Sequence, residues 1–314
     1  MMKKKAIIIS IKSYTLSSNE KLLFKKNPWG VILFKRNIKN LSQIKSLISS
    51  IKKITKNPYF PILIDEEGRT VTRLSNILKH EFSQMDLGRL YISNPEVAVN
   101  LYKNYINNLT SILKKIGINI NTVPVLDVLR KNTSKVIGAR SFSYNSQVVK
   151  TLGDVCVKQY NLNKIATVIK HIPGHGCATV DSHFKLPKVV LALNNLNKID
   201  FVPFKSNKSL FAMTAHILYS KIDNENVATF SKKIISKIIR KKFRFKGILI
   251  SDDISMKSLK YDLVTNAKKS LLAGCNIILY CAGNYRDSLK LLKNVPNIDK
   301  FTTKKTSEFY KFLR

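Results

Sequence analysis

The sequence predicts an α/β fold: a (β/α)8 TIM-type barrel forming a single domain over residues 1–314. Three observations lead to this prediction. Short runs rich in Ile and Val alternate with helical periodicities, which is typical of a parallel sheet covered on both faces. About eight such units in a chain of this length favour a barrel over an open doubly wound sheet. No glycine-rich phosphate loop follows the first run, which argues against a dinucleotide-binding fold.

The individual elements follow from local patterns. Near-continuous apolar runs of strand length predict strands at residues 6–11, 31–34, 60–64, 118–123, 166–169, 211–214, 247–250 and 276–279. Apolar residues spaced three and four apart predict helices, for example at residues 41–54, 97–115, 146–160 and 231–240. There is no short repeat and no low-complexity linker, so one domain is expected.

The sequence composition also indicates the cellular compartment of the protein. The apolar run that follows Lys3, Lys4 and Lys5 is short and ends at Lys12 without a cleavage site, so a buried strand is expected rather than a signal peptide. No stretch reaches the roughly 18 apolar residues of a membrane span. The four cysteines have no metal-ligand spacing and are expected to be free thiols in a reducing compartment. These features predict a cytoplasmic protein with no membrane span.

The formal net charge of +36 needs an explanation. Clustered Lys and Arg can indicate a nucleic-acid partner, because they release counterions from phosphates. Here the basic residues are spread along the chain, and residues 232–246 alternate them with Ile and Phe as an amphipathic surface helix would. No nucleic-acid partner is therefore expected, although a basic nucleic-acid-binding protein stays an alternative. The charge also favours anionic substrates.

Polar residues follow several of the predicted strands. Asp65 follows Ile64, Lys170 and His171 follow Ile169, and His216 and Asp252 come just after two later strands. In a barrel, the carboxyl ends of the strands carry the active site. Any one histidine could be a hydrogen-bonded structural residue. The presence of four at such ends predicts a site there; they are His171, His175, His183 and His216.

The segment from Lys170 to His183 reads KHIPGHGCATVDSH, and its Pro and Gly residues predict a shaped loop after a strand. Asp181 and His183 are two residues apart, close enough for the carboxylate to bind one imidazole nitrogen and leave the other for proton transfer. The alternative is a metal site made by His171, His175, Asp181 and His183.

The segment GILISDDISM, residues 247–256, places two adjacent carboxylates after a strand. Such a carboxylate can be a nucleophile, a general base or a metal ligand. Since adjacent strand residues point to opposite faces, only one of Asp252 and Asp253 is expected to face substrate. Asp253 could instead cap a helix. A third cluster, DEEGR at residues 65–69 with Arg73, suits sugar hydroxyls, although a surface ion-pair loop would look similar.

These segments resemble the β-N-acetylglucosaminidases of glycoside hydrolase family 3, which act in bacterial cell-wall recycling. The resemblance covers about residues 6–285, in family order. The loop and SDDISM are the most specific segments. The others are GVILFKRN (30–37), PILIDEEGRTVTR (61–73), GININTVPVLDV (117–128), IGARSF (137–142) and MTAHI (213–217).

The resemblance implies roles for matching residues. Asp252 matches the nucleophile that forms a glycosyl-enzyme intermediate, His183 the general acid/base and Asp181 its orienting partner. The positions that match binding of N-acetylglucosamine are Asp65, Arg73, Arg140, Lys170 and His171, with His175 lining the same pocket. The chain departs from the family at Gly68-Arg69-Thr70, where a double glycine and arginine are usual, and at Cys177-Ala178, where Asp-Thr is usual.

The resemblance therefore predicts a retaining glycosidase that removes nonreducing-end β-linked N-acetylglucosamine from muropeptides, without metal or other cofactor. A retaining enzyme normally pairs two carboxyl groups about 5–5.5 Å apart. Here an imidazole with an unperturbed pKa of about 6.5 replaces one of them. Phosphorolysis on the same scaffold is an alternative, because a neutral imidazole does not repel phosphate. The expected partner is a small carbohydrate substrate, and the expected state is a monomer.

Overall fold

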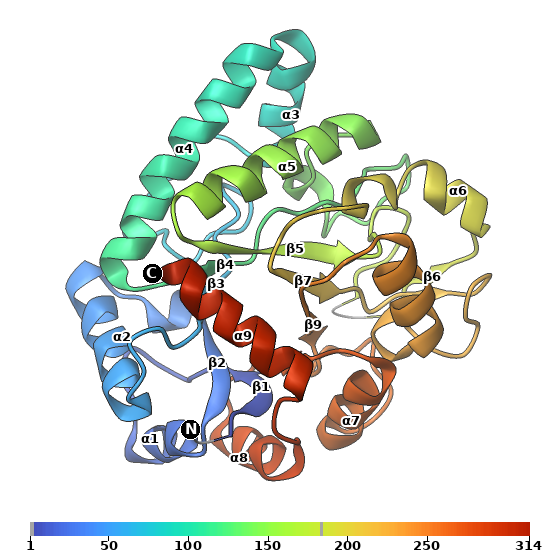
Figure 1. Ribbon diagram of the computed structural model, residues 1–314. Helices are drawn as coiled ribbons and strands as arrows, with labels where there is room; N and C mark the ends of the chain where they lie inside the picture. Colours follow the sequence, from blue (N-terminus) through green and yellow to red (C-terminus); the bar gives the residue numbers. More distant parts are fainter. Residues whose placement is uncertain (1–2, 183–184) are drawn as a thin grey trace.

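The computed structural model describes residues 3–182 and 185–314, which form a closed barrel of parallel strands surrounded by helices (Figure 1). Around the barrel the order is β1-β10-β9-β7-β5-β4-β3-β2, so the predicted (β/α)8 fold is confirmed. The barrel strands are β1 (Lys5–Ile9), β2 (Pro28–Leu33), β3 (Ile62–Ile64), β4 (Ile120–Asn121), β5 (Ala166–Ile172), β7 (Phe211–Thr214), β9 (Ile248–Asp253) and β10 (Ile277–Leu279). All eight predicted runs contain or overlap one of these strands.

Helices pack around the outside of the barrel, and a two-stranded parallel sheet, β6 (Lys188–Val189) with β8 (Leu218–Tyr219), lies apart from it. The α-helices are α1 (Ser18–Lys25), α2 (Leu41–Thr55), α3 (Gln84–Ser93), α4 (Pro95–Ile116), α5 (Ser146–Leu162), α6 (Leu193–Lys198), α7 (Leu263–Ala273), α8 (Tyr285–Asn294) and α9 (Lys300–Leu313). Short 3-10 turns are η1 (Lys35–Asn37), η2 (Gly138–Arg140), η3 (Val202–Phe204) and η4 (Ala228–Phe230), and η5 (Ile234–Lys242) is a π-helix.

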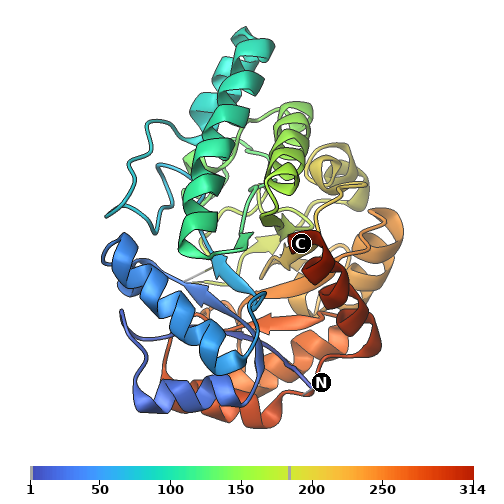
Figure 2. The same ribbon diagram turned by 60° about the vertical axis from the view of Figure 1, so that its left-hand side comes forward.

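The helices form where the sequence signals predict them. In α2 the Asn40 side chain accepts a hydrogen bond from the amide of Gln43, and the apolar face at three- and four-residue spacing is buried. Helix α4 begins with Pro95 after the capping residue Asn94 and ends at Ile116, followed by the capping residue Gly117, whose φ of 92° suits glycine. It packs against α3 and α5 on the outside of the barrel (Figure 2). The predicted helix at residues 231–240 appears as the π-helix η5, which begins and ends two to three residues later.

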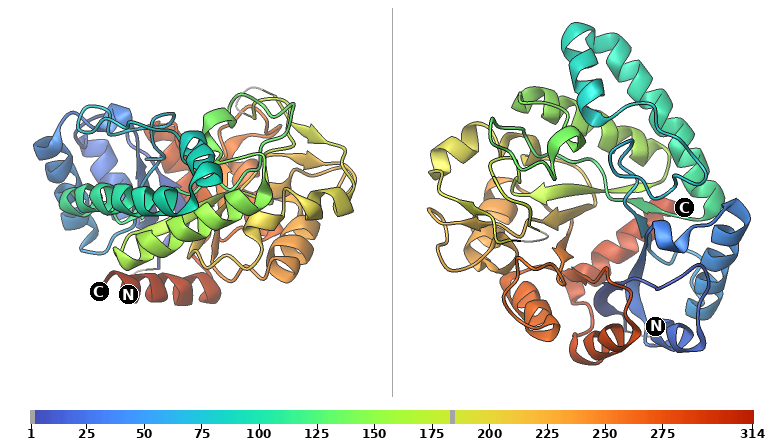
Figure 3. Two further views of the ribbon diagram at one scale, coloured as in Figure 1. Left: turned by 90° about the horizontal axis from the view of Figure 1, so that it is seen from above. Right: turned by 180° about the vertical axis from the view of Figure 1, so that it is seen from behind.

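Two hydrophobic cores hold the barrel together. The larger lies between the strands and the surrounding helices, and the smaller fills the barrel interior with side chains such as Ile8, Leu63 and Val168. Phe309 of α9 enters this inner core, with its ring centroid 5.3 Å from that of Phe211. Helix α9 therefore lies across one end of the barrel and closes it (Figure 3).

Within residues 3–182 and 185–314, no helix combines the length and the apolar character needed to cross a lipid bilayer. All four cysteines are free thiols, as expected.

Candidate active site

A cavity of about 440 Å³ opens at the carboxyl ends of the barrel strands. Asp252 and all the residues matched to sugar binding line it, namely Asp65, Arg73, Arg140, Lys170, His171 and His175. Asp181 lies beside Ser182, which is also part of the lining. His183 lies outside the described residues. The structure thus brings together side chains that are up to 187 positions apart in the chain, from Asp65 to Asp252.

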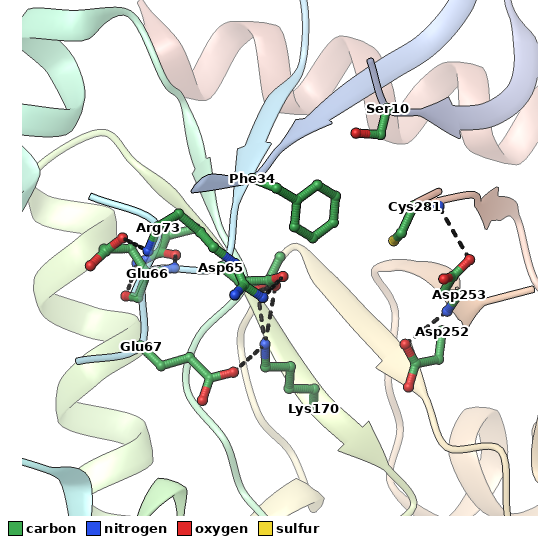
Figure 4. A network of polar contacts seen from close by, with 12 residues as sticks. Ser10, Phe34, Asp65, Glu66, Glu67, Arg73, Lys170, Asp252, Asp253 and Cys281 are labelled. Atoms are coloured by element: carbon green, nitrogen blue, oxygen red, sulfur yellow. Dashed lines mark hydrogen bonds and ion pairs between the residues drawn. The ribbon is translucent and has the colours of Figure 1, made fainter. Parts of the chain in front are cut away.

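One wall of the cavity is a network of buried charges that includes Asp65, directly after β3, and Lys170, near the end of β5 (Figure 4). Asp65 accepts hydrogen bonds from Arg73 at 3.1 Å and from Lys170 Nζ at 3.3 Å. Glu67 pairs with the same Lys170 at 2.6 Å and receives two hydrogen bonds from Arg140, at 2.8 and 2.9 Å. The bidentate pair fixes the plane of the guanidinium at the cavity wall.

The cations of this network lower the pKa of its two cavity carboxylates, Asp65 and Glu67. Burial alone would raise the pKa of Asp65, but Lys170, Arg73 and the Thr122 hydroxyl outweigh burial and hold that pKa well below its usual range. For Glu67, the Arg140 guanidinium and the Lys170 ammonium overcome burial and lower the pKa to about 2. This wall therefore presents fixed carboxylate acceptors beside cationic donors, which suits the hydroxyl groups of a sugar.

Glu67 and Asp127 were not predicted as site residues, yet both organise the cavity. Asp127 is fully buried, and its Oδ2 lies 2.7 Å from Nδ1 of His171. Its Oδ1 accepts from the backbone amides of His171 at 3.2 Å and His175 at 2.6 Å. One carboxylate thus orients the imidazole of His171 and holds the start of the loop that carries Asp181.

The first part of this loop is tightly held. Gly176 approaches the backbone so closely that a Cβ would lie 1.7 Å from the carbonyl oxygen of Val128. The carbonyl of Gly176 accepts from the Thr133 hydroxyl, and the hydroxyl of Tyr219 donates to the carbonyl of Gly174. Ser134 N–H also donates to the carbonyl of Ala178 at 2.8 Å. These contacts fix the loop as far as residue 178.

Asp252 lies at the end of β9, across the cavity from Asp65 and Lys170 (Figure 4). Its Oδ1 accepts from the amide of Asp253 at 2.8 Å. Asp253 also lines the cavity, but its carboxylate is directed away from Asp252 toward the amide of Cys281, at 3.2 Å, and toward Ser255. Both aspartates therefore contribute to the lining, but their carboxylates diverge, and which of them faces substrate stays a prediction.

Two other interpretations of single residues are also corrected. Asp253 belongs to β9 and does not cap a helix, since the residue that caps α7 is Asp262. His216 is fully buried behind β9 rather than at the cavity. Its Nε2 donates to the carbonyl of Asp253 at 3.0 Å and its Nδ1 lies 2.7 Å from the hydroxyl oxygen of Thr229, so it supports the end of β9.

The acidic cluster after β3 is not a surface ion-pair loop, because Glu66 and Glu67 are buried. Glu66 accepts from the amides of Arg73 and Leu74, at 2.7 and 2.9 Å. Its other oxygen lies 2.5 Å from Nε2 of His80. Glu66 therefore shapes the segment that presents Arg73. Arg69 does not reach the cavity and forms a largely exposed pair with Asp86 at 2.9 Å.

In the part of the chain that the structure describes, no three His, Cys, Asp or Glu side chains gather as a metal site would require. The metal alternative also needed His183, which lies outside that part. What the described residues do provide is one carboxylate, Asp252, facing a charged wall suited to polyhydroxylated ligands.

A (β/α)8 barrel with such a polar cavity at its carboxyl end defines the class of the protein: a barrel enzyme. The particular family follows from comparison with known sequences. Residues 3–307 match the glycosyl hydrolase family 3 N terminal domain, and the chain belongs to this family.

Relatives and solved structures agree with this family. A β-hexosaminidase of Bordetella pertussis is 33% identical over 291 residues, covering 90% of this chain and 82% of the relative. One from Neisseria gonorrhoeae is 32% identical, covering 88% of this chain and 77% of the relative. The crystal structure of NagZ from Neisseria gonorrhoeae, in complex with N-trifluoroacetyl-D-glucosamine, superposes with a TM-score of 0.87 at 28% identity. That alignment covers 99% of this chain and 90% of the other.

Proposed function

We propose that this chain removes nonreducing-end β-linked N-acetylglucosamine from peptidoglycan-derived muropeptides, with retention of configuration. It is a glycosidase of the β-N-acetylhexosaminidase type. The observation that carries the proposal is the position of Asp252, across one cavity from the Asp65–Lys170 wall. A sugar held by that wall presents its anomeric carbon toward Asp252.

In the proposed reaction, Asp252 attacks the anomeric carbon and forms a covalent glycosyl-enzyme intermediate. His183, oriented by Asp181, protonates the departing oxygen and then removes a proton from the incoming water. The carboxylate of Asp252 receives a hydrogen bond from the amide of Asp253 at 2.8 Å, which keeps it oriented. An imidazole on a glycine-containing loop also offers a route for closing over the bound sugar.

The remaining residues are proposed to bind the sugar. Asp65 and Lys170 offer an acceptor and a donor that can share one pair of adjacent hydroxyls. Arg140 and His171 are each oriented by a buried carboxylate, Glu67 and Asp127 respectively, so their free hydrogen-bonding positions are set before substrate arrives. His175, buried beside His171, completes that side of the pocket.

The cellular compartment, the oligomeric state and the absence of a cofactor are also part of the proposal. The four free thiols support a reducing compartment, and we place the enzyme in the cytoplasm. We propose that the barrel acts as a single-domain monomer, and that the reaction uses the side chains above without a cofactor.

The decisive assay compares aryl N-acetyl-β-glucosaminide with the matching β-glucoside, each with and without phosphate. We expect hydrolysis of the first substrate, retention of configuration in the first product by NMR, and no phosphate dependence. Sugar 1-phosphate formation would instead establish phosphorolysis. Asp252→Ala should lose about a thousandfold or more in kcat, and azide should restore turnover by forming the α-glycosyl azide.

Asp253→Asn is the matched control for the nucleophile assignment. Asp253 binds Ser255 and the amide of Cys281, so its loss should disturb the end of β9 without abolishing the covalent step. Azide rescue of the Asp253 variant but not of Asp252→Ala would reverse the assignment. Near-wild-type activity of Asp252→Ala would refute it.

A further inference from the structure

Lys135 differs from the other cations of the cavity in which the sugar is proposed to bind. Among the described residues, the Lys and Arg side chains that line this cavity are Arg73, Lys135, Arg140 and Lys170. Three of them pair with the carboxylates of the charged wall, at 3.1 Å for Arg73, 2.8 Å for Arg140 and 2.6 Å for Lys170. Lys135 is exposed, and no carboxylate of residues 3–182 or 185–314 forms an ion pair with it. Its charge is therefore available to a bound ligand.

The backbone on both sides of Lys135 is held in place. The amide of Ser134 donates to the carbonyl of Ala178, in the loop between β5 and β6, at 2.8 Å. The carbonyl of Val136 accepts a hydrogen bond from the guanidinium of Arg140 at 2.9 Å. Arg140 is in turn fixed by its bidentate pair with the charged wall. Lys135 therefore lies at the edge of the cavity, between the β5–β6 loop and the wall that is proposed to hold the sugar.

The proposed reaction determines where the aglycone begins. Because Asp252 attacks the anomeric carbon from one face, the bond to the departing oxygen lies on the opposite face. The proposed acid protonates that oxygen from the β5–β6 loop, which reaches the same cavity through Ser182. The aglycone therefore begins beside this loop, and the hydrogen bond between Ser134 and Ala178 places Lys135 beside the same loop.

The aglycone of the proposed substrate is anionic. The peptide of a muropeptide carries free carboxylates, so its negative charge lies beyond the bond that is broken. The attraction between an exposed ammonium and a carboxylate is modest in water. At this edge of the cavity, however, it acts on the aglycone and leaves the contacts of the sugar unchanged. A cation placed here therefore raises kcat/KM for acidic aglycones over neutral ones.

We propose that Lys135 is a specificity-determining residue that binds a carboxylate of the aglycone beyond the scissile bond. The inference rests on the proposed function above. It assigns the preference for acidic aglycones to one side chain at the edge of the cavity rather than to the overall positive charge of the chain. Removing the charge of Lys135 should therefore affect acidic aglycones alone.

Three substrates test this role. The first is the aryl N-acetyl-β-glucosaminide, whose leaving group carries no carboxylate. The second is N-acetylglucosamine β-linked to a sugar bearing a lactyl group and a short peptide with free carboxylates. The third is the same compound with its carboxylates amidated. Lys135→Gln should lower kcat/KM roughly two- to fivefold on the second substrate only, and Lys135→Arg should keep it near the wild-type value.

Lys131→Gln is the matched control. Lys131 is exposed on the same segment, four positions before Lys135, but it does not line the cavity. The control removes the same charge from the same part of the surface, so kcat/KM on the acidic substrate should stay near that of wild type. An equal fall in Lys131→Gln and Lys135→Gln would assign the effect to the general field of this surface and refute the role of Lys135.

Charge reversal tests the same contact in the other direction. Lys135→Glu should lower kcat/KM on the acidic substrate further than Lys135→Gln does, because the introduced carboxylate repels that of the aglycone. Unchanged kcat/KM on the acidic substrate in both variants would overturn the proposal. An equal fall on all three substrates would overturn it too, because Lys135 would then support the site as a whole. Failure of wild-type protein to cleave the aryl substrate would instead refute the proposed function.

Discussion

His175 shows how a single buried residue links the site to pH. Burial lowers the pKa of His175 to about 4, with a smaller opposing effect from Asp127, so the imidazole is neutral near pH 7. In the unfolded state, the His175 imidazole binds a proton near pH 6.5, which is a higher pH than the folded state requires. Above about pH 6.5, protonation of His175 therefore does not lower the free energy of unfolding. As pH falls from there to about 4, the free energy of unfolding decreases by up to about 3 kcal/mol.

We therefore predict that His175→Gln removes this part of the acid sensitivity. Urea unfolding at intervals between about pH 7 and about pH 4 should show wild type losing stability faster than the variant. The difference between their free energies of unfolding is the measurement, because it cancels the other titrating groups. Parallel curves would contradict the prediction.

At the scale of single residues, sequence located the side chains that face the cavity but not those that hold them. Asp65, Lys170, His171 and Asp252 could be found because each follows an apolar run. Asp127 also follows such a run, yet its role depends on His171, 44 positions away, and on a backbone amide that no side-chain pattern reveals. Glu67 was within a noted cluster, but its pairing with Arg140 spans 73 positions.

Among the elements, the loop between β5 and β6 carries the proposed acid/base pair and a very close backbone approach at Gly176. Gly176→Ala would place a Cβ 1.7 Å from the carbonyl oxygen of Val128, so the loop must shift. We predict a loss of roughly a hundredfold in kcat/KM on the aryl substrate, because small displacements of catalytic groups are costly. Circular dichroism should show the barrel retained.

Gly138→Ala is the control for this change. Gly138 precedes Arg140 in the same rim, and a Cβ there meets nothing within 4 Å, although its φ of 37° adds some strain. Its activity should stay within a few-fold of wild type by the same reasoning. Equal losses in both variants would show that any rim perturbation suffices, and would remove the specific role of the Gly176 contact.

Helices and strands could be predicted where the apolar sequence pattern was long, and not where it was short. The barrel strands are buried on both faces, so each gives an apolar run that sequence reveals. β6 and β8 have two residues each and were not predicted, because such a segment has no detectable period. The π-helical hydrogen bonding of η5 was not predicted either, because its apolar residues have the spacing expected of an α-helix.

For the whole molecule, the net charge of +36 is the dominant electrostatic feature. Charges of one sign spread over a compact surface repel each other, and salt screens that repulsion. We predict that the urea midpoint rises as NaCl increases from about 0.02 to about 0.3 M, while kcat on the neutral aryl substrate stays constant. A flat or falling midpoint would show that local ion pairs outweigh the overall repulsion.

Because α9 closes one end of the barrel, it affects the order in which substrate, water and products enter and leave. With Phe309 and the inner core filling the other end, substrate, water and both products share the mouth at the carboxyl end of the strands. In the proposed two-step reaction, the aglycone therefore leaves the entrance before the hydrolytic water approaches the anomeric carbon. An aglycone that binds tightly at this mouth delays that water, so tight binding of the leaving group and fast turnover oppose each other in the proposed reaction.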